Sequence, residues 1–220
     1  GGVSLYDIAD NSSSTSGAIV IGDPQTGNVY YIDQDGESTF EPTADDRRYI
    51  GDPNPDFIYS LGNNFTYKEF GLDIFLQGSQ GNDIFNASRL QMESMIDSKN
   101  QLASVLNRWR QPGDITDIPR VNTESSTNNS RLSNRYVEDG SYLRFKAITF
   151  SYSFKENTLD KLHLEALKFY LTGENLITIT DYSGFDPQVN AFGADNLVQG
   201  VDFGTYPQTR NVIFGMNVRF

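Results

Sequence analysis

Five segments of this chain alternate between apolar and polar residues, and the connections between them differ greatly in length. Alternation with a period of two puts successive side chains on opposite faces, which predicts strands of a sheet with one apolar face. The predicted strands are about 57–68, 70–79, 142–154, 167–180 and 208–220. The short connections are the Lys68-Glu69 turn and 155–166, and the long ones are 80–141 and 181–207. Compact domains rarely contain structureless loops of that length, so the unequal connections restrict the possible folds strongly.

Short connections at one end of a sheet and long ones at the other are typical of outer-membrane β-barrels. The apolar face then contacts lipid, and tilted strands of about 9–11 residues suffice to cross the bilayer. If Phe220 lies at the periplasmic side, Tyr67, Phe70 and Phe154 also lie there, where an aromatic girdle is expected. Five strands cannot close such a barrel, so we expect more strands N-terminal to Gly1. The predicted fold class is therefore β: the C-terminal strands of a large antiparallel transmembrane β-barrel, as a fragment with long extracellular loops.

Three local features refine this prediction. Arg144 and Lys146 fall on the apolar parity of their strand, and we place them near its outer end, where a charge facing lipid costs least. The spacing of apolar residues predicts a helix over about 86–106, with Asn86 as its N-cap. The stretch 122–134 is rich in Ser, Thr and Asn, which indicates a solvated loop.

The predicted organisation has two parts. Residues 1–56 form an extracellular loop region, and residues 57–220 contain the barrel strands with the extracellular loops 80–141 and 181–207. The alternative is a soluble or surface-anchored β-sandwich module that binds carbohydrate. The two differ in what covers the apolar face, because a sandwich buries it against a second sheet.

Composition excludes several classes of protein. The 220 residues include no Cys and one His, so a disulfide framework, a thiol nucleophile and a Cys-ligated metal are excluded. The single histidine, His163, lies in the connection 155–166 and is expected to be solvated. A formal charge of −12 argues against a protein whose main task is binding nucleic acid.

Several short motifs match one known family in order and spacing. They are Tyr49-Ile-Gly-Asp-Pro-Asn-Pro-Asp-Phe57, Tyr67-Lys-Glu-Phe-Gly-Leu-Asp-Ile-Phe-Leu-Gln-Gly78, Gly81-Asn-Asp-Ile-Phe-Asn86, Arg108-Trp109, Asp117-Ile-Pro-Arg120, Tyr136-Val-Glu-Asp-Gly-Ser-Tyr-Leu-Arg144, Gly173-Glu-Asn-Leu176, Tyr182-Ser-Gly-Phe-Asp-Pro187 and Tyr206-Pro207. Over roughly 28–220 the chain resembles the C-terminal region of SusC/RagA-type TonB-linked outer-membrane transporters. It departs from the family at Gln188, where an acidic residue usually follows Asp-Pro, and at 33–36, where a longer Asp-rich run is common.

The resemblance implies nutrient import without enzymatic activity. Such transporters look like barrels that are closed by an N-terminal plug and capped by a SusD-like lipoprotein, in dimers of transporter–lid pairs. They lie in the outer membrane of Gram-negative bacteria, in contact with its lipid, and the TonB complex acts on the N-terminal part. The implied ligand is an oligosaccharide or a peptide, and neither a nucleic-acid partner nor an obligatory cofactor is expected.

The candidate substrate-binding residues lie in the two long loops. They are Arg108, Trp109, Arg110, Tyr182 and Phe185. Trp stacks on sugar faces and Arg donates paired hydrogen bonds, but the same cluster could instead pack a loop onto the barrel or the lid. Asp181 and Asp186 could form a glycosidase pair only in a cleft, which nothing in the sequence indicates.

Two further candidates lie near the chain ends. Asp33, Asp35 and Asp45 could bind Ca²⁺ through carboxylate oxygens, although the spacing is not that of an EF-hand and an acidic, solvated hairpin is the simpler interpretation. Phe220 closes an amphipathic strand, which resembles the recognition signal for barrel assembly in the outer membrane.

Overall fold

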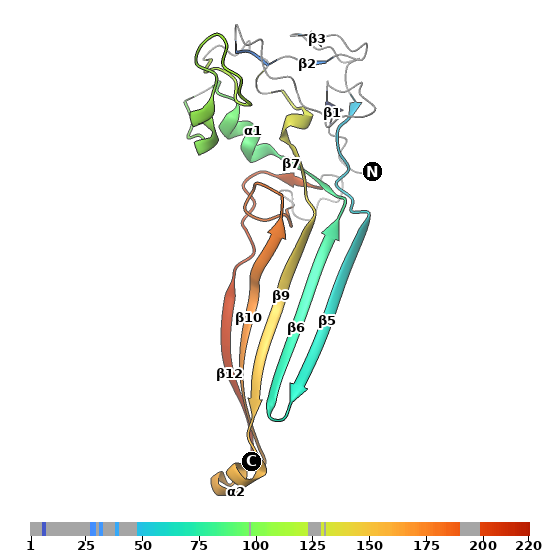
Figure 1. The fold of residues 1–220 in the computed structure, drawn as a ribbon, viewed down its shortest axis with the longest axis vertical. Helices are drawn as coiled ribbons and strands as arrows, with labels where there is room; N and C mark the ends of the chain where they lie inside the picture. The colour runs from blue at the N-terminus through green and yellow to red at the C-terminus, as the bar shows by residue number, and fades with distance from the viewer. Residues whose placement is uncertain are drawn as a thin grey trace. The chain divides into compact units, whose positions relative to one another are not determined.

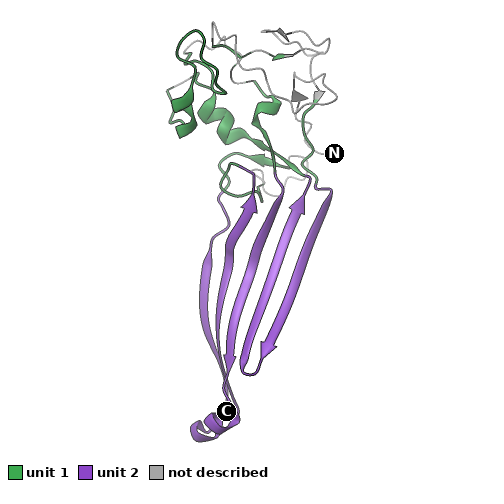
Figure 2. Cartoon of the chain, viewed as in Figure 1, with its two compact units in different colours: residues 1–54, 82–139, 183–205 green, residues 55–81, 140–182, 206–220 purple. Residues whose placement is uncertain are grey.

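The computed structural model describes residues 6–7, 27–29, 31–32, 38–39, 48–96, 98–122, 129, 131–189 and 199–220. The chain forms two compact units, which Figure 2 distinguishes by colour. The sheet unit consists of residues 55–81, 140–182 and 206–220, and the loop unit consists of 1–54, 82–139 and 183–205. Most of both long connections therefore belongs to one unit together with the N-terminal segment.

The sheet unit contains one antiparallel sheet with the strand order β12-β10-β9-β6-β5 (Figure 1). The strands are β5 (Phe57–Tyr67), β6 (Phe70–Gln80), β9 (Tyr142–Ser153), β10 (Ala166–Thr180) and β12 (Asn211–Arg219). They lie where the alternation predicts strands. Lys68, in the turn between β5 and β6, has a left-handed conformation with φ of 55°.

The register separates an apolar face from a polar face. One cross-strand row on the apolar face consists of Phe65, Leu72, Phe150, Leu171 and Phe214. The adjacent row on the polar face consists of Asn64, Asp73, Thr149, Thr172 and Ile213. The apolar side chains are accessible, with Phe214 70% and Phe150 49% exposed. Among its described residues the sheet unit has no second sheet that could bury this face as a β-sandwich does.

Aromatic rings form a row across the apolar face, and it begins at Phe70, the first residue after the β5–β6 turn. The successive pairs have ring centroids 5.0–5.8 Å apart and are Phe70–Tyr152, Tyr152–Phe154, Phe154–Phe169 and Phe169–Phe214. Offset and edge-to-face pairs at such distances are favourable. The row contains Phe70 and Phe154, two of the four residues that the sequence assigns to a girdle.

The prediction that Arg144 faces the apolar side is wrong, because β9 contains a bulge. Lys146 has no register partner on β6, since Ala147 and Phe145 oppose consecutive residues of that strand. One extra residue reverses the alternation, so that Phe145 joins the apolar face and Arg144 the polar face. Arg144 is only 1% exposed there, and its Nε donates to Thr178 Oγ1 at 2.9 Å.

Strand β10 has a larger bulge at the same level, and the Gly173–Leu176 motif forms it. Asn175 and Leu176 both lack a register partner on β9, so the alternation of β10 is preserved. Asn175 has a left-handed conformation, with φ of 52°, and its Nδ2 donates to the Thr209 carbonyl at 2.9 Å. Leu176 folds over Gly173, where an added Cβ would lie 2.5 Å from Leu176 Cδ1. Glycine therefore leaves space for the bulged leucine.

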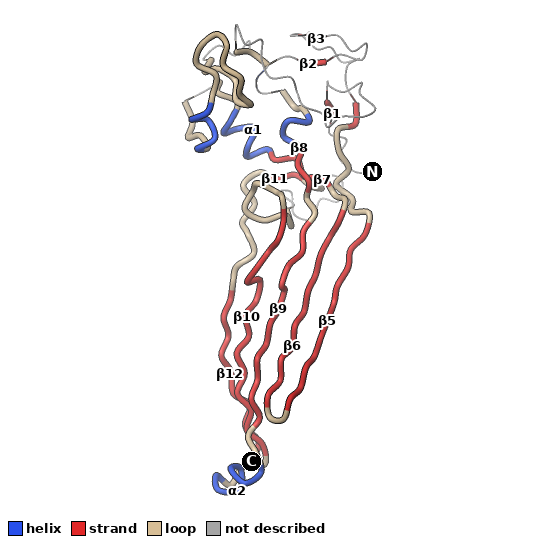
Figure 3. Tube along the Cα trace, in the orientation of Figure 1, coloured by secondary structure: helices blue, strands red, loops and turns tan. Residues whose placement is uncertain are grey.

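The connection between β9 and β10 contains a helix that the sequence analysis treats only as a turn. Helix α2 (Glu156–Leu162) lies at the same end of the sheet as the β5–β6 turn (Figure 3). It ends at His163, which is exposed and left-handed, with its backbone N–H directed at the carbonyls of Asp160 and Leu159. Nearby, Lys155 Nζ lies 3.1 Å from Glu69 Oε1.

The loop unit has its own small sheet and core. Its elements include β7 (Asp83–Asn86), α1 (Ala87–Glu93), η1 (Ala103–Asn107), η3 (Asn134–Tyr136), β8 (Val137–Asp139) and the two-residue β11 (Val201–Asp202). Four two-residue strands form two further pairs: β1 (Tyr6–Asp7) with β4 (Arg48–Tyr49), and β2 (Tyr31–Ile32) with β3 (Ser38–Thr39). The three-stranded sheet has the order β11-β7-β8, and its core contains Phe85, Ala87, Leu90, Tyr136 and Val201.

The predicted helix 86–106 is correct only at its start. Asn86 is the N-cap, with Oδ1 accepting the Arg89 N–H at 2.8 Å, but α1 ends at Glu93. Met95 then adopts a left-handed conformation and packs with Val105 and Ile118 in a buried cluster. The apolar residues whose spacing predicts one long helix instead lie in separate segments, and Met95 and Val105 pack together with Ile118.

The stretch 122–134 is also less solvated than predicted. Among its described residues, Asn122, Asn129 and Ser133 are buried. No helix in the described part of the chain is long and apolar enough to cross a membrane.

Candidate functional site

Glu138 in β8 joins three of the family-like motifs within the loop unit. Its Oε1 accepts hydrogen bonds from Asn86 Nδ2 at 3.1 Å, Ser183 Oγ at 2.9 Å and Arg89 Nη1 at 3.3 Å. Its Oε2 accepts the Ser183 N–H at 2.8 Å. A carboxylate has about four acceptor sites, so one side chain can hold segments that are far apart in the sequence.

A second carboxylate extends this network. Glu93, which is buried, accepts from Arg89 Nε and from Ser104 Oγ, both at 2.6 Å. Burial acts to lower the pKa of Arg89, but the charge of Glu93 and the hydrogen bonds to Glu93 and Glu138 outweigh burial and raise it. The result is a charge-assisted network that orders the segment after β7.

The segments around Asp52 and Asp83 are joined by reciprocal hydrogen bonds. The Asp52 N–H donates to Asp83 Oδ2 at 2.9 Å, and the Asp83 N–H donates to the Asp52 carbonyl at 2.7 Å. Two hydrogen bonds from Asn54 lower the pKa of Asp52. Burial is the main cause that raises the pKa of Asp83, and the negative charges of Asp139 and Asp52 raise it further. The hydrogen bond from the Asp52 backbone lowers this pKa but does not cancel the increase.

The Arg108-Trp109-Arg110 cluster makes its contacts within the loop unit, with Arg108 and Trp109 half-buried and Arg110 exposed. The backbone N–H of Trp109 donates to the Ile118 carbonyl at 2.9 Å, and Arg108 forms a β-bridge with Ile118. The indole ring covers Gly27, where an added Cβ would lie 2.4 Å from the ring. Arg110 donates through Nη2 to the Leu106 carbonyl at 2.8 Å. These contacts favour the anchoring interpretation, and a ligand contact of this cluster stays a prediction.

The other loop candidates have different environments. Tyr182 is buried in the sheet unit, whereas Phe185 belongs to the loop unit and is 86% exposed. Asp186 is buried, and its Oδ1 accepts the Gln188 N–H at 2.9 Å, so this carboxylate stabilises a turn. Asp181 and Asp186 belong to different units, and nothing in either environment supports a glycosidase pair.

The calcium candidates Asp33, Asp35 and Asp45 lie outside the described residues. Within the described ranges, no group of three or more His, Cys, Asp or Glu side chains could hold a metal ion. Phe220 follows β12 and is exposed, and its role in barrel assembly stays a prediction.

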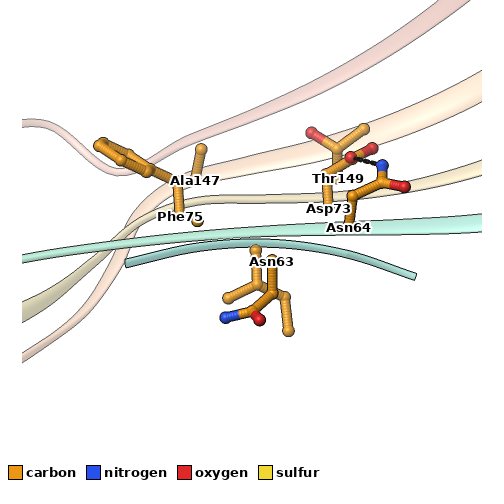
Figure 4. Close-up of a pocket in the computed structure, with 8 residues that line it drawn as sticks. Asn63, Asn64, Asp73, Phe75, Ala147 and Thr149 are labelled. Carbon is orange, nitrogen blue, oxygen red and sulfur yellow. Dashed lines mark hydrogen bonds between the residues drawn. The ribbon is translucent and has the colours of Figure 1, made fainter. Parts of the chain in front are cut away.

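A hollow on the polar face of the sheet is a feature that sequence analysis missed (Figure 4). It measures about 310 Å³ and is lined on this face by Gly62, Asn64, Asp73, Phe75, Ala147 and Thr149. Asn64 Nδ2 donates to Asp73 Oδ1, and Figure 4 shows Phe75 and Ala147 on the same side of the sheet, with Asn63 pointing away. Neighbouring strands contribute these residues, so only the register brings them together.

Comparison with known proteins identifies the relatives of this chain. No model of a known protein family matches it. It is 36% identical over 207 residues to TonB-dependent receptor P3 of Formosa agariphila, which covers 92% of this chain and 20% of the receptor. It is 22% identical over 196 residues to TonB-dependent receptor SusC of Bacteroides thetaiotaomicron, covering 86% of this chain and 17% of SusC. The chain is homologous to SusC/RagA-type TonB-dependent receptors.

Solved structures of the RagAB peptide importer share the fold of this SusC/RagA homologue. The match to the open-open state has a TM-score of 0.74 at 22% identity and covers 90% of this chain and 21% of the other. The closed-closed state gives a TM-score of 0.75 at the same identity. The sequence-based resemblance and the predicted fold class are thereby confirmed. The chain spans about a fifth of the length of the curated relatives that it matches.

Proposed function

We propose that this chain forms part of the barrel wall and of the external loops of a TonB-dependent importer in the outer membrane of a Gram-negative bacterium. The observation that carries the proposal is a sheet with an accessible apolar face, an aromatic row across it and a polar opposite face. Together with the receptor and importer relatives, this combination supports membrane transport.

The apolar face requires a hydrocarbon environment. The row Phe65, Leu72, Phe150, Leu171 and Phe214 would expose five large side chains to water, at roughly 25 cal/mol for each Å² of apolar surface. In lipid these side chains are solvated, and the aromatic row takes the interfacial position that girdles occupy. The edge strands β5 and β12 must then pair with further strands, because bare backbone groups are too costly in hydrocarbon.

The polar face then borders the lumen through which the nutrient passes. Transport of this kind needs selective contacts and no covalent chemistry. The relatives bear the names of receptors and importers, which agrees with a protein that is not an enzyme.

The proposed nutrient is an oligosaccharide or a peptide, and the proposed partner is a SusD-like lipoprotein that acts as a lid above the loops. Support comes from the similarity to SusC and to the RagAB peptide importer. Coupling to the TonB complex would lie in the N-terminal part of the receptor, and transporter–lid pairs would form dimers.

Fractionation of the native bacterium tests this proposal. The full-length receptor should sediment with outer membranes, require detergent for extraction and co-purify with a lipoprotein. Deletion of its gene should abolish energised uptake of the cognate nutrient. Release of the receptor as a stable soluble monomer without detergent would contradict the proposal and favour the β-sandwich alternative.

A further inference from the structure

We infer that the three segments of the loop unit open and close as one cooperative body, so that a contact made with one segment changes the stability of the other two. The segments are 1–54, 82–139 and 183–205, which are named the N-terminal, middle and C-terminal segments. The inference goes beyond the proposed function, because it concerns how the external connections move and not what is transported.

The three segments meet at Gly200, which belongs to the C-terminal segment. Gly200 has a left-handed conformation, with φ of 69°. An added Cβ there would lie 2.6 Å from Cβ of Pro53 in the N-terminal segment and 3.0 Å from the carbonyl oxygen of Asp83 in the middle segment. The Gly200 carbonyl accepts the Phe85 N–H at 2.8 Å. All three segments therefore touch at one position that only glycine occupies without strain.

The middle segment is hydrogen-bonded to both of the others around β7. At the start of β7, Asp83 exchanges two hydrogen bonds with Asp52 of the N-terminal segment. Further along β7, Phe85 pairs in parallel with Val201 of the C-terminal segment. Because β7 is also the central strand of the sheet β11-β7-β8, displacing it breaks hydrogen bonds on both sides.

The three segments also share one apolar core. Its buried residues are Phe85, Ala87, Leu90 and Tyr136 of the middle segment and Val201 of the C-terminal segment, and Ile50 of the N-terminal segment packs against them. Opening any one segment would expose apolar surface that the other two cover, and this cost makes the segments open together.

The C-terminal segment is held to the middle segment near both of its ends. At Ser183, the backbone N–H and the hydroxyl both donate to Glu138, at 2.8 and 2.9 Å. At Gly204, the backbone N–H donates to Ser88 Oγ at 2.8 Å. These contacts, like those at Gly200, lie entirely within the loop unit, so they hold whatever chain surrounds it.

Shared contacts of this kind have a functional consequence, which rests on the proposed function. Proteins open locally in contiguous cooperative units, and a ligand that binds only the closed form stabilises the whole unit. A lipoprotein that binds any one segment should therefore stabilise all three.

Hydrogen exchange of the full-length receptor in lipid vesicles, followed by mass spectrometry, tests the inference. In the wild type, the amides of Asp52, Asp83 and Ser183 should have protection factors within about threefold of one another, because they open together. Gly200→Ala should raise the exchange rate of all three by roughly tenfold, because alanine is strained in a left-handed conformation. An increase confined to 199–205 would overturn the inference.

Gly113→Ala is the matched control. Gly113 is also left-handed, with φ of 97°, but among the described residues no atom lies within 4 Å of an added Cβ. The backbone strain is similar, so faster exchange should stay within the turn where Asp114 Oδ2 accepts the N–H groups of Arg110 and Gln111. An equal spread of faster exchange in both glycine variants would mean general destabilisation and would refute the cooperative body.

Two further measurements keep the test decisive. Glu138→Gln changes no backbone conformation, so it replaces Gly200→Ala if that variant fails to assemble; it should raise exchange several-fold in all three segments, and an increase at Ser183 alone would contradict the inference. Adding the co-purified lipoprotein to the wild type should slow exchange in all three segments, and slowing in one alone would also contradict it. A receptor without any lipoprotein partner would refute the proposed function, whereas the variants would still decide this inference.

Discussion

Phe150→Arg tests which face of the sheet contacts lipid. Phe150 lies on the apolar face of the central strand β9, in the row with Leu72 and Leu171, and its ring is 5.7 Å from that of Phe70. Arginine facing lipid costs about 2–4 kcal/mol at the bilayer midplane and less toward the interfaces. Phe150 is three residues from the end of β9, roughly 10 Å along the strand, so the lower end of that range applies. Loss of the aromatic pair adds about 0.5–1.5 kcal/mol, for a total of roughly 3 kcal/mol.

The adjacent residue supplies a matched control. Thr149 has its side chain on the polar face, where its hydroxyl is 2.8 Å from that of Thr172. Thr149→Arg should therefore cost about 1 kcal/mol, the value of one hydrogen bond, because its guanidinium stays in water.

Both variants are measured in the full-length receptor by denaturant unfolding in lipid vesicles and by the amount of folded receptor in outer membranes. Phe150→Arg should lower the unfolding free energy by roughly 3 kcal/mol and reduce assembly, and Thr149→Arg should stay close to the wild type. The opposite order, with Thr149→Arg the more damaging, would reverse the face assignment and refute the reasoning.

Three further predictions concern the loop unit and the bulge. Glu138→Gln removes one of the two carboxylates that pair with Arg89 and weakens the acceptor for Asn86 and Ser183, so limited proteolysis should cut the loops several-fold faster. Glu165→Gln, which breaks an exposed pair with Arg219, should change the rate little. The pKa of Asp83 is higher in the folded chain than in the unfolded chain, so the folded state favours the protonated carboxyl. This stabilisation is fully present below the unfolded pKa and is lost as the pH rises through the folded pKa. Asp83→Asn should therefore raise protease resistance over the wild type at pH 7 and lose that advantage as the pH falls toward 3; an equal effect at both pH values would contradict the assigned pKa shift. Gly173→Ala should reduce folded receptor in outer membranes, because its Cβ meets Leu176, whereas truncating that side chain as well, in Gly173→Ala/Leu176→Ala, should restore part of it; the absence of rescue would rule out this contact as the cause.

Strand positions were predictable because alternation is a local property. A strand such as β12 shows its two faces in its own residues, and lipid or protein contact on one face leaves a period of two in the sequence. The loop motifs were predictable as matches in order and spacing, but their contacts were not. Nothing around Glu138 indicates that it binds Ser183, which is 45 positions away.

The candidate site shows the same division. Trp109 was recognisable as a notable side chain, yet only the folded loop shows that Gly27 occupies one face of its ring. The hollow around Phe75 could not be predicted, because its residues come from three strands and their alignment depends on the cross-strand register.

What the sequence alone determined was the type of sheet, the strand positions and the relationship to TonB-dependent receptors. Tertiary structure decided the face on which Arg144 lies, the early end of α1 and the gathering of distant loop segments into one unit. The physical reason is that a bulge such as Lys146 exists only relative to the register of the neighbouring strands. Likewise, the hydrogen bonds of a buried acceptor come from donors that are far away in the chain. Neither leaves a periodic pattern in neighbouring residues.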